Sequence, residues 1–311
     1  MSDTAHETAP AVAPRELAEP PSAPVRRSFL RSKLARLASL TALVVGLLTG
    51  AVIVATPAAA DQIGQAPTAA NITGNGSFAT TSARITNASG FGGGIVYYPT
   101  QTGRYPVVSV SPGFTAAWSS IDWIGPRLAS WGFVVVGIET NSRFDQPTSR
   151  GSQLIAALNW AVNSSPTAVR SRVDGSRRGV AGHSMGGGGT LSALSRQDGS
   201  LIKAGVPLAP WNQDKTWSEV TEAVMIVGGS ADSTAPDAQH SIPFYNSLGG
   251  QKGFVEIAGA GHLFPTSQNA IVSRAMVSWF KRFLNNDARF TPFTCGFGSV
   301  GGISQFRTNA C

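Results

Sequence analysis

The middle of the chain reads Arg-Gly-Val-Ala-Gly-His-Ser-Met-Gly from Arg178 to Gly186, and its last five residues form a G-x-S-x-G pentapeptide. The residues before the pentapeptide are typical of a short strand, and residues 190–196 are typical of a helix start. On such a strand–turn–helix the serine Oγ projects from the sheet edge, and the two glycines leave room for the sharp turn. The stretch therefore predicts a nucleophile elbow that carries Ser184. The alternatives are a Gly-rich turn with an idle serine and a phosphate-binding loop, but that loop needs Lys where Gly188 stands.

Strand-like and helix-like segments alternate on both sides of this elbow. Residues 77–85 and 94–98 flank a turn-rich segment and predict an antiparallel hairpin. Further strands are expected at 107–110, 133–138, 204–208, 223–227 and 254–257, and helices at 121–131, 148–163, 238–248 and 269–283 and in the other gaps after the elbow. The last helix has a core-facing pattern, with apolar residues at Ile271, Ala275, Trp279 and Phe283. The alternation predicts one α/β domain over residues 61–311, with a mostly parallel sheet covered by helices.

A serine hydroxyl needs a neighbouring base to act as a nucleophile at neutral pH. Residues 61–311 contain three histidines. His262 stands in a loop just after the strand ending at Ile257, where this fold class holds its base. His183 adjoins the serine, so we expect its side chain to diverge and pack beside the strand. His240 falls in an expected helix, and the sequence allows it either to line the cleft or to lie on the surface.

The base needs an acid, which lies between the serine and the histidine in chain order. Asp232 is the only acid in that interval that follows a strand by a short turn. Asp237 is the nearest rival, but the preceding Pro and the expected helix indicate a capping acid there. The sequence thus predicts Ser184, Asp232 and His262 as a catalytic triad.

Acyl transfer also needs two donors for the oxygen that becomes negatively charged. We expect these to be the backbone N–H groups of Met185 and of Phe114, which lies in the loop after the strand ending near Val110. The side chain of Phe114 would then line the cleft, and a core aromatic is the alternative.

The first sixty residues carry the features of an export signal. A basic region at residues 26–31 precedes an apolar run from 37 to 55, and the run is followed by small residues at 58–60. This order is typical of a signal peptide that is removed, here after Ala60. Its paired arginines followed by Phe and Leu are similar to a twin-arginine signal, with general secretion as the other route. An uncleaved anchor is the alternative, because the run is nearly long enough to span a bilayer.

The charge balance argues against a nucleic-acid partner. Residues 61–311 keep 18 Lys and Arg against 13 Asp and Glu, a net charge of +5, and the basic residues are scattered. We also expect no stable membrane association once the signal is removed, because no other stretch approaches a membrane-spanning length. A monomer is the default for an exported chain of this size.

Both cysteines, Cys295 and Cys311, lie in the last seventeen residues. In an exported chain such a pair predicts a disulfide. Two free thiols or a metal site are the alternatives, and no histidine stands nearby to complete a metal site.

Separated segments of the chain resemble the actinobacterial cutinases and related polyester hydrolases. They are Ser-Pro-Gly-Phe-Thr-Ala at 111–116, Gly-His-Ser-Met-Gly-Gly-Gly-Gly at 182–189 and Pro-Phe-Tyr-Asn-Ser-Leu at 243–248. The likeness covers nearly all of residues 61–311. It implies an α/β-hydrolase fold without a lid domain, and a secreted serine esterase that acts on cutin and often on synthetic polyesters such as poly(ethylene terephthalate). Such an esterase needs no cofactor.

The resemblance carries over the same triad and the same oxyanion donors. It also implies a substrate cleft flanked by four further residues: Trp211, Thr234, His240 and Phe244. Trp211 would be an aromatic platform for acyl groups, although the sequence by itself equally allows a core residue.

The chain departs from the family pattern at several positions. Many relatives carry Tyr where Phe114 stands, and Thr234 replaces an aliphatic residue, which affects the expected substrate preference. Calcium-stabilised relatives use acids at the positions of Ser230 and Ala258, so we expect no metal site of that kind.

The alternative function is a carboxylesterase or lipase for small or emulsified esters. A binding protein on a hydrolase scaffold would require a broken triad, and all three triad positions are filled.

Overall fold

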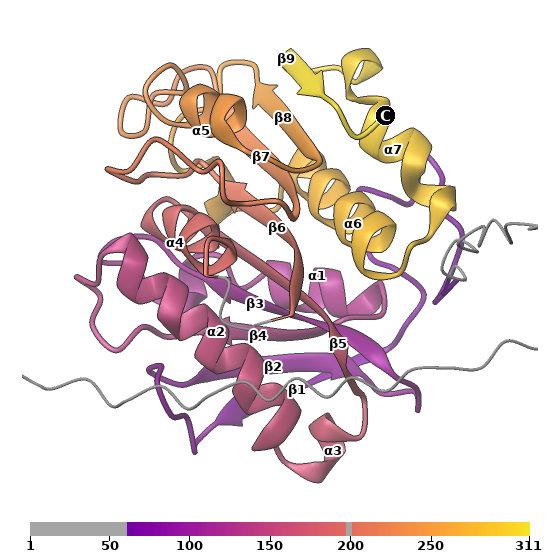
Figure 1. Ribbon diagram of the computed structural model, residues 1–311. Coiled ribbons are helices and arrows are strands. Elements are labelled where there is room, and N and C mark those ends of the chain that lie inside the picture. Colours follow the sequence, from indigo (N-terminus) through magenta and orange to yellow (C-terminus); the bar gives the residue numbers. More distant parts are fainter. Residues whose placement is uncertain (1–60, 197–200) are drawn as a thin grey trace, which may run out of the picture. The chain divides into compact units, whose positions relative to one another are not determined.

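The computed structural model describes residues 61–196 and 201–311 (Figure 1). The predicted export signal, residues 1–60, lies outside the described residues. None of the described helices is both long enough and apolar enough to cross a membrane.

A nine-stranded sheet organises the described chain, in the order β1-β2-β4-β3-β5-β6-β7-β8-β9. The strands β3 to β8 are mutually parallel, whereas β1, β2 and β9 complete the two ends of the sheet by antiparallel pairing. Their bounds are β1 Thr80–Ile85, β2 Gly94–Pro99, β3 Tyr105–Ser111, β4 Val134–Ile138, β5 Val173–His183, β6 Ile202–Leu208, β7 Ala223–Gly229, β8 Lys252–Ile257 and β9 Ile303–Thr308.

Helices cover both faces of this sheet, because its central strands are apolar on both sides. Val108 of β3 packs in one core cluster together with α1 and α6, while the adjacent Val107 packs in the other cluster with α2, α4 and α5. The helices are α1 Ile124–Ser130, α2 Pro147–Asn163, α3 Thr167–Arg170, α4 Met185–Leu194, α5 Ser241–Ser247, α6 Ala270–Leu284 and α7 Thr291–Cys295. The predicted α/β-hydrolase class is confirmed, and the carboxyl ends of the parallel strands share one edge of the sheet.

The structure differs from the predicted elements at two places. The segment between β6 and β7 contains no helix; short turns centred on Asn212 and Asp214 shape it, because each side chain accepts a hydrogen bond from the backbone two residues on. Strand β9 was not predicted. It is an edge strand with partly exposed residues, so its sequence lacks the continuous apolar run that reveals the central strands.

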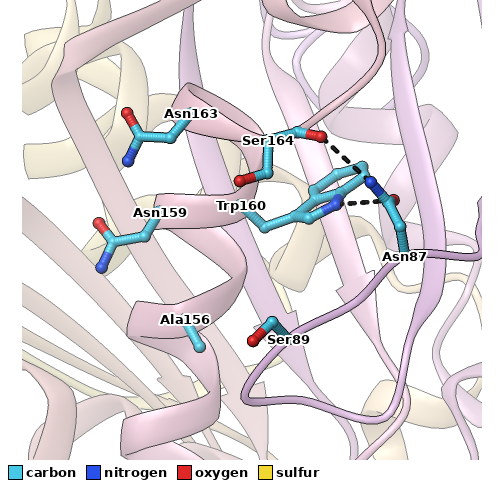
Figure 2. Close-up of a pocket in the computed structure, with 7 residues that line it drawn as sticks. All are labelled: Asn87, Ser89, Ala156, Asn159, Trp160, Asn163 and Ser164. Carbon is cyan, nitrogen blue, oxygen red and sulfur yellow. Dashed lines mark hydrogen bonds between the residues drawn. The ribbon is translucent and has the colours of Figure 1, made fainter.

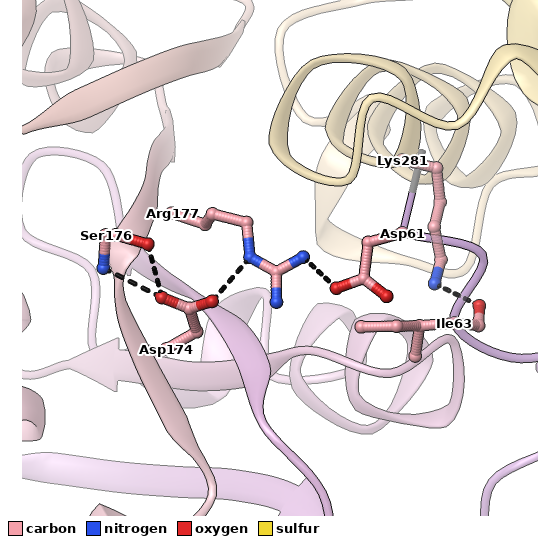
Figure 3. Close-up of polar contacts among 6 residues, drawn as sticks. All are labelled: Asp61, Ile63, Asp174, Ser176, Arg177 and Lys281. Carbon is pink, nitrogen blue, oxygen red and sulfur yellow. Dashed lines mark hydrogen bonds and ion pairs between the residues drawn. The ribbon is translucent and has the colours of Figure 1, made fainter. Parts of the chain in front are cut away.

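The buried face of α6 is wider than the predicted stripe of apolar residues. Ala275 and Trp279 are buried as expected, Ile271 and Phe283 are only partly buried, and the charged Lys281 is fully buried. Figure 3 shows its surroundings: the Lys281 Nζ donates to the carbonyl of Ile63 (2.7 Å). The first described residues are thereby held against α6.

Asp61 extends the same network. Its backbone N–H donates to the carbonyl of Asn285 (2.9 Å), and its carboxylate pairs with Arg177, which also pairs with Asp174 (2.7 Å; Figure 3). At the other terminus the predicted disulfide is confirmed, since Cys295 and Cys311 are bonded.

Candidate active site

The nucleophile elbow forms at the end of β5. Ser184 follows the last residue of that strand with φ 56° and ψ −120°, a strained conformation for a residue with a side chain, and α4 begins at Met185. A Cβ on Gly182 would clash with the backbone of Gly186, and one on Gly186 would clash with the carbonyl of Ser111. The two glycines of the motif are therefore required by close backbone approach.

Three side chains from three loops meet at this elbow. The His262 Nε2 lies 2.8 Å from the Ser184 Oγ, and the His262 Nδ1 lies 2.8 Å from the Asp232 Oδ2. Because a carboxylate only accepts hydrogen bonds, Nδ1 carries the proton and Nε2 is free to accept from the serine hydroxyl. This is the arrangement that a serine nucleophile and its base require.

Asp232 is held as an anion by its surroundings. Burial raises the pKa of its carboxyl, but hydrogen bonds from His262, Ala235 and Thr234 outweigh burial and keep the pKa below its usual value. The backbone N–H groups of Thr234 (2.8 Å) and Ala235 (2.7 Å) both donate to Oδ1. The acid is therefore ionised and fixed in orientation at neutral pH.

The loop that carries His262 is tied to its neighbours on both sides. The Ser230 Oγ accepts from the N–H of Gly259 (2.8 Å), and the N–H of Ala231 donates to the carbonyl of Ala260 (3.0 Å). The N–H of Ala258 reaches the carbonyl of Gly302, next to β9 (2.9 Å). The loops after β7 and β8 thus form one unit that keeps the histidine close to its acid.

His183 has a place that the sequence did not predict. It is buried beside His262, with 5.0 Å between ring centres, and its Nε2 lies 2.9 Å from the carbonyl oxygen of His262. Burial lowers the pKa of His183 to about 4, so the ring is neutral and donates from Nε2 to that carbonyl. Its side chain does not simply pack beside the strand, as expected, but supports the backbone of the predicted base.

The two predicted oxyanion donors are free in the described chain. Neither the N–H of Phe114 nor that of Met185 donates to any described protein group. The loop that carries Phe114 lies against the elbow, because a Cβ on Gly113 would be 3.1 Å from the Cβ of Ser184. Both N–H groups are therefore available beside the serine.

A cleft of about 220 Å³ opens over Ser184. Three large apolar side chains are exposed in or beside it: Phe114 (42%), Phe144 (68%) and Leu263 (65%). The rings of Phe114 and Phe144 pack edge to face with 5.7 Å between their centres. We call these three side chains the apolar rim.

Three of the other predicted cleft residues form a stack of rings, which does not line the 220 Å³ cleft itself. Trp211 is half-buried, and its ring lies 5.8 Å from the ring of the buried His240. His240 in turn packs edge to face on Phe244, at 5.7 Å. Phe244 is fully buried, so its side chain does not reach the cleft surface but lies beneath His240. Thr234 is exposed on the loop after Asp232.

Lys215 is a residue that the sequence did not single out. Its Nζ lies 2.9 Å from the Nδ1 of His240 and donates to the carbonyl of Asn212 (2.6 Å). Burial and the Lys215 charge lower the pKa of His240 to about 4. His240 is therefore neutral, accepts from Lys215 at Nδ1, and carries its proton on Nε2.

Asp237 does not cap a helix, contrary to the prediction. Helix α5 begins only at Ser241, and both carboxyl oxygens of Asp237 are buried without a hydrogen bond that meets ordinary geometry among the described residues. Burial raises its pKa to about 7, and the nearby Glu256 adds to this effect. The capping argument failed because the turn before α5 is longer than the sequence indicated.

A second hollow lies away from the elbow, between the β1–β2 loop and the end of α2 (Figure 2). The indole N–H of Trp160 donates to the Asn87 Oδ1 (3.0 Å), and the Asn87 Nδ2 donates to the carbonyl of Ser164 (3.2 Å). The polar groups that line it are uncharged amides and hydroxyls. It shares no lining residue with the cleft at Ser184.

Among the described residues, no group of three or more His, Cys, Asp or Glu side chains has the spacing to hold a metal ion. At the positions where the resemblance expects acids, Ser230 uses its hydroxyl within the loop and Ala258 offers only its backbone.

Comparisons with known proteins identify the family. Residues 55–311 match the model of a family described as PETase, PET hydrolase-like. The chain is 43% identical to a cutinase of Thermobifida fusca over 288 residues, which cover 89% of this chain and 95% of that cutinase. It is 47% identical to cutinase 1 of Thermobifida cellulosilytica, over 71% of this chain and 86% of the relative. It is also 44% identical to a bis(hydroxyethyl) terephthalate hydrolase of Streptomyces coelicolor, over 86% and 89%.

Proposed function

The chain belongs to the PET hydrolase-like family, and from this premise we propose that it is a secreted serine ester hydrolase of cutinase type, which cleaves cutin and polyesters such as poly(ethylene terephthalate). One observation carries the proposal: a continuous hydrogen-bonded line runs from Asp232 through His262 to Ser184 beneath an open cleft.

In the first half of the reaction, the Ser184 Oγ attacks the ester carbonyl carbon while the His262 Nε2 takes the hydroxyl proton. The ionised Asp232 stabilises the imidazolium that forms and keeps its Nδ1 proton in place. The imidazolium then returns the proton to the alcohol oxygen as the carbon–oxygen bond breaks. The products of this half are a free alcohol and an acyl group on Ser184.

Water completes the reaction. His262 takes a proton from water, the resulting hydroxide attacks the acyl carbon, and the Ser184 oxygen leaves with the proton from the imidazolium. One ester and one water thus give one acid and one alcohol, and no cofactor takes part.

Both halves place negative charge on the former carbonyl oxygen. The N–H groups of Phe114 and Met185 stabilise this charge by donating hydrogen bonds to the oxygen, because they flank Ser184 and donate to no other described protein group. Loss of one such donor commonly lowers kcat by about 10²- to 10³-fold.

The cleft surface supports a polymeric ester as substrate. The segment between β6 and β7 holds no helix that covers the serine, and the apolar rim is exposed to solvent. Trp211 offers a flat apolar surface for acyl or aromatic groups, with His240 beside it and Thr234 on the neighbouring loop. Phe244 acts indirectly, as the support of His240.

We further propose that the chain is exported with cleavage after Ala60 and works as a monomer outside the cell. The cleaved chain would begin at Asp61, whose contacts with Asn285 and Arg177 hold this end against the domain. Sequencing of the amino terminus of protein from the culture medium tests the cleavage, and a terminus elsewhere than Asp61 would contradict it.

The decisive test incubates the purified protein and its Ser184→Ala variant with a polyester film or cutin, and measures the soluble acids released. Release that depends on Ser184 supports the proposal. Serine-dependent cleavage of soluble esters without attack on the film would favour a small-ester carboxylesterase, and hydrolysis unchanged in Ser184→Ala would refute the assignment of the nucleophile.

A further inference from the structure

Arg150 is a charged residue in an unusual place. It lies at the end of the first turn of α2, and its side chain is fully buried. No described carboxylate forms an ion pair with it. Burial lowers the pKa of its guanidinium to about 10, so the group is still a cation at neutral pH. A buried cation without an ion pair is costly unless its N–H groups are hydrogen-bonded.

The guanidinium satisfies these donors with backbone carbonyls alone. Its Nε donates to the carbonyl of Asp145 (2.8 Å), one terminal nitrogen to that of Pro112 (3.0 Å) and the other to that of Arg143 (2.9 Å). Pro112 belongs to the loop after β3, whereas Arg143 and Asp145 belong to the loop after β4. One planar group therefore joins two loops that are about thirty residues apart in sequence.

These contacts bracket Phe114 on both sides. Pro112 precedes it by two residues and is held directly by Arg150. Thr115 follows it, and the N–H of Thr115 donates to the carbonyl of Arg143 (2.8 Å), which Arg150 also holds. Thr115 has φ 62°, a left-handed conformation that a β-branched residue keeps only when its surroundings enforce it. The peptide that presents the N–H of Phe114 is thus fixed at both ends.

Phe144 is bracketed in the same way, since Arg143 and Asp145 flank it and both carbonyls accept from Arg150. The two exposed aromatic rings that pack on each other beside the cleft, Phe114 and Phe144, therefore share one buried anchor.

We propose that Arg150 is a positioning residue, which aims the N–H of Phe114 at the oxygen that becomes negatively charged during ester hydrolysis. The inference rests on the proposed function, because it assumes that this N–H serves as an oxyanion donor. Arg150 touches no substrate, and it acts only through the carbonyls of Pro112 and Arg143.

The fork of the guanidinium is essential to this role. A lysine keeps the charge, but its single ammonium on a flexible stem does not reproduce three donors in one plane. Arg150→Lys therefore separates the geometry from the charge. The N–H donor is misaimed rather than removed in this variant. We therefore expect kcat to fall by about 10- to 100-fold, which is at or below the lower end of the loss that follows removal of a donor.

Arg178→Lys is the matched control. Arg178 is also buried, and it also contacts α2, where it donates to the Asn159 Oδ1 (2.8 Å) and to the carbonyl of Gly175 (2.7 Å). Neither contact lies near the cleft, so this variant shares the loss of a buried guanidinium without disturbing the loop of Phe114.

The experiment measures kcat and KM with 4-nitrophenyl acetate, after titration of active sites with a fluorophosphonate to correct for inactive protein. It also measures inhibition by phenylboronic acid, whose tetrahedral adduct with the serine places an oxygen in the oxyanion site. For Arg150→Lys we expect kcat to fall about 10- to 100-fold, KM to change less than about threefold and the boronate Ki to rise with the loss of kcat. Arg178→Lys should retain both kcat and Ki.

A purely structural role for Arg150 would lower the melting temperature and the titrated fraction, but leave kcat per active site and Ki as in Arg178→Lys. That result would overturn the inference. Loss of activity in Arg150→Lys combined with normal activity in Ser184→Ala would instead refute the proposed nucleophile.

A second variant covers the case in which Arg150→Lys does not fold. Gln153 lies one turn further along α2, accepts from the N–H of Asn141 (2.7 Å) and donates to the Asp145 Oδ2 (2.8 Å). Gln153→Leu loosens the loop that carries the Arg143 carbonyl and leaves the guanidinium in place. We expect a smaller effect of the same kind, with kcat down and the boronate Ki up by about threefold, and unchanged values of both would overturn the proposal.

Discussion

The disulfide between Cys295 and Cys311 should contribute to stability almost entirely by restricting the unfolded chain. Cys311 is exposed and Cys295 is only partly buried, so replacement of both by Ala leaves little cavity. The bond closes a loop with a sequence separation of 16, for which loop-closure entropy gives about 3 kcal/mol. In a domain of this size, each kcal/mol corresponds to about 2–4 °C in Tm, so the double variant should melt about 6–12 °C lower.

Catalysis in the folded variant should be unaffected. Cys311 follows the end of β9, where Thr308 pairs with Gly253 at the start of β8. The loop of His262 leaves the opposite end of β8, where the N–H of Ala258 donates to the carbonyl of Gly302. The disulfide therefore fastens the part of β9 that is remote from the triad.

The assay is thermal unfolding of the protein and of Cys295→Ala/Cys311→Ala, together with kcat at 25 °C. Wild-type protein unfolded in excess reductant serves as the control, and it should melt at the temperature of the double variant. A decrease in Tm below about 2 °C would refute the loop-entropy argument. A large change in kcat at 25 °C would refute the claim that this end of β9 is uncoupled from the triad.

Three further predictions concern stability. Asp237→Asn should raise Tm, because burial raises the pKa of this carboxyl to about 7 and folding therefore opposes its ionisation. Measured by calorimetry, the gain in Tm should be absent below pH 4, grow between pH 4 and pH 7 and stay constant above pH 7. Burial lowers the pKa of Lys281 to about 7, so its charge destabilises the fold most below pH 7. Between pH 7 and pH 10 the free energy of unfolding of wild type relative to Lys281→Met should rise by up to about 1.4 kcal/mol per pH unit. A difference that does not change with pH would contradict this. Calcium should change Tm by no more than about 1 °C relative to EDTA, because Ser230 and Ala258 offer no carboxylates, and a rise of several degrees would show another calcium site.

The predicted features whose geometry the structure reproduces depend on short-range signals. The elbow is specified by glycines within two residues of Ser184, and Asp232 and His262 each follow an apolar strand by a short turn. Chain order then limits the candidates for base and acid. The strands β3 to β8 were found for a similar reason, since strands buried on both faces are continuous apolar runs.

The features that the sequence missed depend on partners that a sequence does not reveal. Arg150 and Lys281 can be buried because backbone carbonyls accept hydrogen bonds from them, and every residue type offers the same carbonyl. The carbonyl bound by Lys281 belongs to Ile63, 218 residues earlier in the chain. The sequence therefore contains no signal that such a charged residue is buried. The place of His183 beside His262 was missed for the same reason, because its partner is the backbone carbonyl of His262.

Two parts of the proposed site, Trp211 and His262, are tied by hydrogen bonds to the end of β5. The carbonyl of Ser184 accepts from the N–H of Gly188 and from that of Trp211, both at 2.9 Å, so the proposed aromatic platform is tied to the backbone of the proposed nucleophile. The adjacent His183 donates to the carbonyl of His262, which ties the base to the same point. Relative movement of nucleophile, base and platform would thus break backbone hydrogen bonds in a buried region, at a cost of about 1–3 kcal/mol for each buried group left unpaired. The side chains of Phe144 and Leu263 are mostly exposed, so they are less restrained than the groups around Ser184, although Arg150 holds the backbone on both sides of Phe144. We therefore expect adaptation to differently shaped esters to fall to the rim side chains, while the proposed reacting groups keep one geometry.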